Sequence, residues 1–283
     1  MAQASRISFT DLLSIQRMAP STKESYLRAV AELSAYHDNQ DPAELTNNQI
    51  QDFLLYSIQD KKLAWSSGNV LFCGLKKYYH EYQGRKLDKF YIPPRTRSQK
   101  KPMVLSRKEV AGLLDETANL KHKALLATVY GSGLRVSEVV HLQPRHIESD
   151  RMMIRVEDSK GGKDRYTVLS QTCLELLREH WLTNRPGEWL FFGRNKKQPM
   201  SIGTAQRVYY QAKNRAGIIR GRGIHTLRHC FASHLLEDGV EIYVIKRWMG
   251  HSALKTTYKY IHLSPDFLSK ATSPLDLLYG EKQ

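Results

Sequence analysis

The second part of this 283-residue sequence carries basic and aromatic side chains whose types suit cleavage of a phosphodiester bond. Without a metal, that reaction needs cations for the non-bridging oxygens, a nucleophile, and a proton donor for the leaving oxygen. Four blocks supply these groups: GSGLRVSEV around Arg135, SKGGKDR around Lys160, HTLRH from His225, and GHSALKTTYKY from His251 to Tyr260. We interpret them as parts of one site.

Two arginines, Arg135 and Arg228, are the candidates for binding the phosphate. A guanidinium offers a planar fork to two phosphate oxygens and keeps its charge at any working pH. Glu138 follows Arg135 by one helical turn, so its carboxylate can orient that guanidinium. The alternative for this pair is an exposed ion pair, which is common at this spacing on helix surfaces.

His225 and Arg228 are three residues apart, which places them on one helical face, while apolar residues of the same segment form a separate stripe. The polar face would then line a cleft. One alternative is a helix start whose His and Arg are solvated, and another is a metal site that adds His229 and His234. HTLRH lacks the glutamate that follows the first histidine of a zincin motif, so we expect neither a metal nor another cofactor.

Tyr260 is the candidate nucleophile. A phenol is a poor nucleophile while protonated, with a reference pKa of ~10, but neighbouring cations favour the phenolate. A phosphotyrosine ester retains the energy of the broken bond, so a strand can be resealed without ATP or a metal. The alternative is a packing residue, because the chain has 15 tyrosines.

The four blocks resemble, in order and spacing, those of the tyrosine recombinases, also called the phage integrase family, which includes the Xer recombinases. The resemblance covers most of the segment from Ser106 to His262. In that family the tyrosine follows the GH histidine by nine residues, which selects Tyr260 over Tyr258. Val168 departs from the family, where proline is frequent, but at a strand end away from the chemistry.

The resemblance implies a role for each residue of the site. Arg135 and Arg228 would bind the scissile phosphate, and Lys160, in the hairpin, would protonate the leaving 5′ oxygen. His225 would accept a proton or donate a hydrogen bond, and His251 would stabilise the transition state. Glu138 would support these groups, and Tyr260 would be the nucleophile.

The resemblance also implies a covalent 3′-phosphotyrosyl link and a Holliday-junction intermediate. The partner is then double-stranded DNA with paired recombination half-sites, bound by a homo-tetramer whose subunits can be monomers in solution. We expect the SPLDLL segment from Ser273 to form a helix that docks either on a neighbouring subunit or on its own domain.

Basic residues outnumber acidic ones on both sides of Pro102, by 15 to 10 before it and by 28 to 18 after it, which gives the net charge of +15. This distribution favours a protein that holds a polyanion from two sides, with nucleic acid ahead of an anionic membrane. We predict further DNA contacts at Lys163, Arg165, Arg220, Arg222, Arg95, Arg97, Lys100 and Lys101. For Lys163 the alternative is an exposed turn residue.

The segment IPPRTRSQKKP, from Ile92 to Pro102, has the composition of a linker. We predict two domains in a chain that is mainly α with a small β-sheet (α+β). Residues 1–98 would form a helical domain similar to the SAM-like core-binding domain of the family, and residues 103–283 the catalytic domain.

Hydrophobic periodicity and capping residues predict the elements. In the first domain a short helical segment covers 9–18, and helices begin at Ser21, at Thr46 and at the pair Ser66 and Ser67. In the second, a helix begins at Ser106, a β-hairpin joins Met152–Glu157 to Arg165–Leu169, EWLFF near Trp189 adds a strand, and helices cover 201–216, 226–238, 241–249 and the surroundings of Tyr260. Gly239 and Gly250 are expected to end helices.

Several classes of protein are disfavoured. The longest apolar stretch, Ala124 to Tyr130, is too short to span a membrane, the N-terminus lacks a secretory signal pattern, and the three cysteines lack zinc-site spacing. We expect a cytoplasmic, nucleoid-associated protein. The alternative functions are a type IB topoisomerase and a non-catalytic DNA-binding relative. The sequences of the HTLRH and GHS blocks argue against a topoisomerase, and the complete set of site residues argues against a non-catalytic protein.

Overall fold

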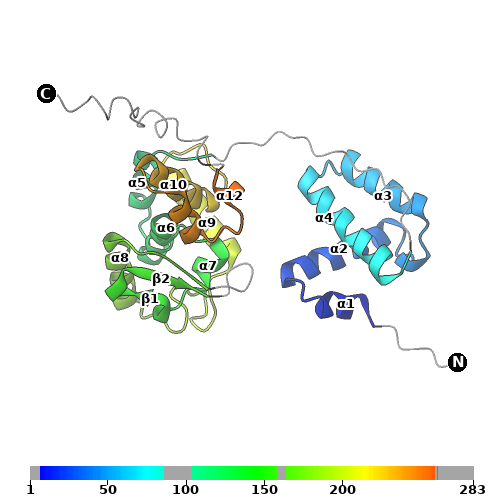
Figure 1. Cartoon of the computed structure of the whole chain (residues 1–283), viewed down its shortest axis with the longest axis horizontal. Coiled ribbons are helices and arrows are strands. Elements are labelled where there is room, and N and C mark those ends of the chain that lie inside the picture. The colour runs from blue at the N-terminus through cyan, green and yellow to red at the C-terminus, as the bar shows by residue number, and fades with distance from the viewer. Residues whose placement is uncertain (1–6, 86–102, 158–163, 259, 261–283) are drawn as a thin grey trace, which may run out of the picture. The chain divides into compact units, whose positions relative to one another are not determined.

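The computed structural model describes residues 7–85, 103–157, 164–258 and 260. The chain forms two compact units, Met1–Ser98 and Gln99–Gln283, and Figure 1 labels most of their helices and the strands β1 and β2. Each unit has a hydrophobic core of its own. Among the described helices, none combines the length and the apolar character needed to cross a membrane.

The first unit is a bundle of helices around leucine and aromatic side chains. Its elements are α1 (Phe9–Ile15), α2 (Pro20–Tyr36), the 3-10 turn η1 (Pro42–Glu44), α3 (Asn47–Gln59), α4 (Trp65–Lys76) and the π-helical η2 (Lys77–Tyr82). Helices α2 and α4 pack closely at Gly74, where an added Cβ would lie 3.1 Å from the Cα of Tyr26. The predicted helical first domain is confirmed.

Two predicted helix starts are confirmed as capping boxes. The side chains of Thr46 and Ser106 each accept a hydrogen bond from the backbone N–H three residues later. Gln49 and Glu109 return a bond by accepting from the backbone N–H of the capping residue. Helices α3 and α5 therefore begin where their sequences satisfy the first free N–H groups.

The other two predicted caps in the first unit are wrong by two residues, because the observed N-caps are Ala19 and Ala64. Helix α2 begins at Pro20, and its N-cap Ala19 makes no side-chain cap bond. Proline suits this position because its fixed φ is helical and a first-turn N–H is not needed. Helix α4 begins at Trp65, ahead of the Ser66 pair, again without a side-chain cap.

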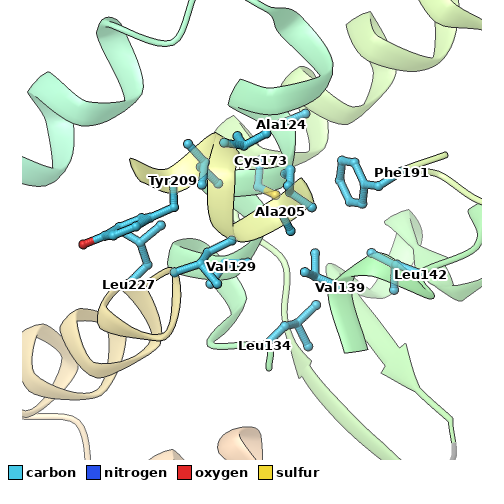
Figure 2. Packing of buried hydrophobic residues seen from close by; sticks show 14 of the residues in the cluster. Ala124, Val129, Leu134, Val139, Leu142, Cys173, Phe191, Ala205, Tyr209 and Leu227 are labelled. Carbon is cyan, nitrogen blue, oxygen red and sulfur yellow. The ribbon is translucent and has the colours of Figure 1, made fainter. Parts of the chain in front are cut away.

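The second unit is built around α6, whose residues 124–129 are all buried. Its helices are α5 (Arg107–Asp115), α6 (Leu120–Ser132), α7 (Val136–Val140), α8 (Gln171–Asn184), α9 (Ile202–Arg215), α10 (His225–Glu237), α11 (Ile242–Met249) and α12 (Leu254–Tyr258). Figure 2 shows Ala124 and Val129 of α6 among side chains from α9, α10 and the loop at Phe191. The apolar stretch that is too short for a membrane forms the centre of this core.

A small antiparallel sheet lies beside these helices. Its strands are β1 (Ile147–Glu148), β2 (Met153–Val156) and β3 (Arg165–Val168), in the order β1-β2-β3, and the 3-10 turns η3 (Pro144–His146) and η4 (Ser149–Arg151) flank β1. Ile154 pairs with Thr167, so the predicted hairpin is confirmed, whereas the two-residue β1 was not predicted. The Thr167 hydroxyl donates to the Ser132 carbonyl at 2.7 Å and thereby joins β3 to the end of α6.

The strand predicted at EWLFF is wrong. Within this described segment Phe192 makes only an isolated bridge, with Pro199. The Leu190 N–H donates to the Leu142 carbonyl, and the Phe191 carbonyl accepts from the Met200 N–H. The apolar run is thus held by single contacts with two loops, at Leu142 and at Pro199 and Met200, rather than by a ladder.

Glycines in the left-handed conformation end the helices next to the site. Gly250 (φ 62°) caps α11 and Gly239 (φ 82°) follows the Asp238 C-cap of α10, so both helices end where predicted. Gly133 (φ 61°) caps α6, and an added Cβ there would lie 2.4 Å from the Phe231 ring. The chain can therefore turn from α6 toward α7 only with glycine at this position.

The loop that leads into α10 is fixed by a buried lysine. The Lys213 ammonium donates to the carbonyls of Ile219, at 2.7 Å, and Gly221, at 3.1 Å. The N–H of Ile224 donates to the Gln206 side chain at 2.9 Å. These bonds hold the backbone just before His225.

We predict that Gly133→Ala lowers the free energy of unfolding by about 2 to 4 kcal/mol, from left-handed backbone strain and overpacking against Phe231. Gly112→Ala is the matched control, because Gly112 lies inside α5 with no atom near its added Cβ. The control should gain up to about 1 kcal/mol. Urea unfolding followed by circular dichroism measures both, and equal stabilities for the two variants would contradict the assignment.

Candidate active site

One carboxylate, Glu138 in α7, joins arginines from three elements. Its oxygens accept from the Arg135 side chain and backbone N–H, both at 2.7 Å, and from two nitrogens of Arg165, at 2.8 and 2.7 Å. Nη1 of Arg228 lies 3.8 Å away. The Glu138 side chain is only 8% exposed, so the alternative of a surface ion pair is wrong. We call Arg135, Arg165 and Arg228 the arginine cluster.

The arginine cluster also binds the C-terminal end of α11. Three successive carbonyls there each accept from a different arginine: Trp248 from Arg165 at 2.9 Å, Met249 from Arg228 at 2.6 Å and Gly250 from Arg135 at 3.0 Å. The free carbonyls at a helix C-terminus carry partial negative charge, which favours cations. The helix end therefore fixes all three guanidiniums side by side.

Arg228 is the most deeply buried member of the cluster, with 1% of its surface exposed. It donates to the carbonyl of Gly133 at 2.6 Å, which ties it to the end of α6. Burial, with help from Arg135, lowers the pKa of Arg228 to about 9, so the side chain keeps its charge at neutral pH. The alternative of a solvated arginine at a helix start is wrong.

The charge of Glu138 is set by its partners. Burial would raise the pKa of its carboxyl, but the hydrogen bonds and charge of Arg165 and Arg135 outweigh burial and lower it to about 2. Glu138 is therefore ionised at neutral pH. One negative charge among three guanidiniums leaves the cluster net positive, as an anion-binding site requires.

Tyr260 lies in a turn after α12, with 3% of its surface exposed, and packs with Phe231 and Met249. The helix expected around it ends two residues earlier, at Tyr258, and the Tyr260 N–H donates to the Thr257 carbonyl at 3.0 Å. Burial raises the pKa of the Tyr260 phenol to about 12, although Arg228 and Arg135 act in the opposite direction. The phenol is thus protonated at rest.

One histidine of α10 contacts the phenol, and a second histidine of the same helix packs against the first. Nδ1 of His229 is 2.8 Å from the Tyr260 hydroxyl, and the two rings are 5.7 Å apart. The His225 ring meets the His229 ring edge to face at 4.8 Å. His225 is exposed at the surface, yet partial desolvation and then the charges of Arg228 and Arg135 lower its pKa, so the ring is neutral at pH 7.

His251, directly after the α11 cap, stacks parallel to the Tyr260 ring at 6.4 Å. Burial lowers its pKa to about 3, and Arg228 is the next largest cause. The ring is therefore neutral, and its Nδ1 lies 2.9 Å from the Thr257 hydroxyl. When Thr257 donates to Nδ1, the ring proton lies on Nε2, from which it can be donated to a phosphate oxygen.

The structure thus brings together all the predicted catalytic residues that it describes. Lys160 lies outside the described residues, as do five of the predicted DNA contacts, Lys163, Arg95, Arg97, Lys100 and Lys101. The segment from Ser273 also lies outside them.

The other predicted DNA contacts differ in exposure. Arg222 is exposed, as expected of a DNA contact. Arg220 pairs through two nitrogens with Glu109, at the cap of α5. Arg165 is 8% exposed and its guanidinium is bound to Glu138 and Trp248, which is not the open position expected of a contact to DNA.

Sequence reasoning did not identify the roles of His229 and Arg165. His229 was considered only as a metal ligand, although its spacing from His225 and Arg228 places all three on one helical face. Among the described residues there is no group of three or more His, Cys, Asp or Glu side chains that could hold a metal ion. No sequence pattern links Arg165 to Glu138, because the pairing depends on how β3 packs near α7.

Two family profiles match the chain. The profile of the phage integrase family matches residues 103–266, and that of the phage integrase N-terminal SAM-like domain matches residues 6–89. The two matches fall in separate units of the structure.

Curated relatives and solved structures agree with these profiles. A putative integrase/recombinase of Sinorhizobium fredii is 35% identical over 94% of this chain and 86% of the relative, and the tyrosine recombinase XerD of Yersinia pestis is 32% identical over 92% and 93%. The crystal structure of the XerH recombinase bound to its difH substrate has a TM-score of 0.70 at 19% identity, covering 94% of this chain and 85% of XerH. At that identity the structural likeness concerns the fold.

We predict that acid lowers the free energy of unfolding of the wild-type protein more than that of Glu138→Gln, because acid protonates Glu138. The folded-state pKa is below that of the unfolded chain, so this stability is present above about pH 4.5 and is lost as pH falls toward 2. The loss amounts to about 3 kcal/mol. Between pH 6 and pH 3, which covers about 2 kcal/mol of this loss, urea unfolding should show the wild type losing about that much more than Glu138→Gln, in which the group cannot titrate. Parallel losses in both proteins would contradict the buried ionised carboxylate.

Proposed function

The chain belongs to the phage integrase family and is a tyrosine recombinase, and we propose that it cuts DNA by attack of Tyr260 on a phosphate bound by Arg135 and Arg228. The observation that carries this proposal is the convergence of a buried phenol, two neutral histidines and a guanidinium cluster at the end of α11. Such a cluster stabilises negative charge that develops on the phosphorane oxygens.

In this proposal each group acts at a stated atom. Arg135 and Arg228 donate to the non-bridging oxygens, and His251 and His225 donate from their neutral rings. The Tyr260 oxygen displaces the 5′ oxygen of the next nucleotide, which leaves a 3′-phosphotyrosyl link. Lys160 supplies the proton to the leaving oxygen, by resemblance to the family, and the reverse reaction joins a new strand without ATP or metal. Glu138 and Arg165 hold the guanidiniums in place.

The substrate and assembly follow from the same proposal. The chain would bind double-stranded DNA with paired half-sites as a homo-tetramer and exchange strands through a Holliday junction. Support comes from solved relatives with the same fold, among them a lambda integrase tetramer bound to a Holliday junction. The exposed Arg222 and the basic segment before residue 103 would add contacts to the DNA backbone.

We further propose that residues 1–98 act as the core-binding domain and residues 103–283 as the catalytic domain, at work on the nucleoid in the cytoplasm. The segment from Ser273 would dock either on a neighbouring subunit or on its own domain. Relatives named integrases and recombinases do not favour the topoisomerase alternative or the non-catalytic one.

We predict that Tyr260→Phe binds DNA but forms no covalent adduct with a nicked suicide substrate, because the substituted ring has no attacking oxygen. Tyr258→Phe is the matched control, since Tyr258 is 45% exposed at the end of α12 and should still form the adduct. Denaturing gel electrophoresis of labelled DNA measures both. An adduct in the first variant, or its loss in the second alone, would refute the choice of nucleophile.

We predict that Arg135→Ala slows adduct formation roughly a hundredfold to a thousandfold, the usual effect of removing one oxyanion donor. The loss should shrink on a methylphosphonate substrate, whose phosphorus carries less negative charge in need of compensation. Arg151→Ala, which removes an exposed partner of Glu148, should cleave both substrates at the wild-type rate. An equal defect of Arg135→Ala on both substrates would indicate a role other than charge stabilisation.

A further inference from the structure

We propose that His229, rather than His225, accepts the proton of Tyr260 as the phenol oxygen attacks the phosphate. This inference rests on the proposed nucleophile and adds the base that activates it. His225 was assigned a proton-accepting role by family resemblance alone, whereas the structure contains a direct contact between the other histidine of α10 and the phenol.

The contact has the geometry of a proton transfer. Nδ1 of His229 lies 2.8 Å from the Tyr260 hydroxyl, within the range that general bases need. The His225 ring instead packs perpendicular to the His229 ring, with the ring centres 4.8 Å apart. His229 is therefore the nearer of the two to the proton that must leave.

The phenol needs such an acceptor. Its pKa of about 12 means that Arg228 and Arg135 do not by themselves generate a phenolate at neutral pH, because burial of the ring opposes them. A phosphate bound between those guanidiniums would weaken their effect on the phenol further. Transfer of the proton during attack avoids forming a free buried phenolate.

The step balances without an outside reagent. When His229 carries its one ring proton on Nε2, Nδ1 takes the hydroxyl proton while the Tyr260 oxygen forms its bond to phosphorus. The bond from phosphorus to the 5′ oxygen breaks, and that oxygen takes the proton of Lys160. Religation runs in reverse, so that the imidazolium of His229 returns its proton to the phenol.

The groups around this pair shape its pH dependence. His225 faces it from the preceding turn of α10, and His251 from the end of α11. Arg228 and Arg135 act on the phenol through their charges. A histidine side chain free of its surroundings titrates near neutral pH. The test must therefore separate any effect of His225 and His251 from that of His229.

His229→Asn is the test variant, because an amide oxygen near the position of Nδ1 can accept the hydrogen bond but cannot hold the proton. On a suicide substrate with a 5′-bridging phosphorothiolate, whose sulfur leaves without an acid, single-turnover cleavage reports on the nucleophile alone. We expect the wild-type rate to rise with pH and level off as an imidazole loses its proton. His229→Asn should be slower by a hundredfold or more at pH 7, with a rate that keeps rising with pH.

Controls separate the base from the fold and from the neighbouring histidine. His229→Asn should bind DNA and unfold thermally like the wild type, and His225→Asn should keep the levelling profile. Imidazole added to His229→Ala should restore cleavage, which gives a second readout if the first variant folds poorly. A rate for His229→Asn within threefold of the wild type, or loss of the levelling only in His225→Asn, would overturn the proposal. In either case an adduct that still depends on Tyr260 would leave the proposed function standing.

Discussion

The site depends on one buried carboxylate that allows three guanidiniums to lie together. Like charges at this spacing repel, and each loses hydration on burial, so Arg135, Arg165 and Arg228 could not share the space without Glu138. Compared with apolar side chains packed in the same space, a buried ion pair contributes little net stability, since desolvation cancels much of the attraction, although breaking the pair is costly. Its benefit is geometric, because positive charge is held in place before any substrate arrives. A phosphate then completes the neutralisation, most strongly when it carries the extra charge of the transition state.

The second support is the last turn of α11. Its three carbonyls each hold one arginine, and the chain continues from the Gly250 cap into His251, α12 and finally Tyr260. The phosphate-binding groups and the nucleophile are therefore fixed to the same short piece of backbone. β3 joins this arrangement through Arg165, and α6 through the bond from Arg228 to Gly133. A displacement of this turn would move the cations and the phenol together.

Local signals in the sequence predicted much of this structure. Capping boxes at Thr46 and Ser106, the hairpin and the stop at Gly250 depend on neighbouring residues, so they could be identified from the chain itself. The one-turn spacing of Glu138 from Arg135 predicted their ion pair correctly.

What the sequence did not predict depends on tertiary contacts. The EWLFF run has strand composition, but packing against loops decides its conformation. Arg165 is the first residue of β3, and no neighbouring residue indicates whether its side chain contacts DNA or a carboxylate 27 residues earlier. The bond from His229 to Tyr260 likewise needs the turn after α12 to fold back onto α10.

Burial of the Tyr260 ring has a consequence for the enzyme between encounters with DNA. A phenol whose pKa is about 12 is ionised in only about one molecule in 10⁵ at pH 7. The idle protein therefore carries almost no free phenolate that could be alkylated. This low reactivity comes from burial of the ring in the fold itself, so the side chain is kept inert until a proton acceptor and a phosphate are both in place.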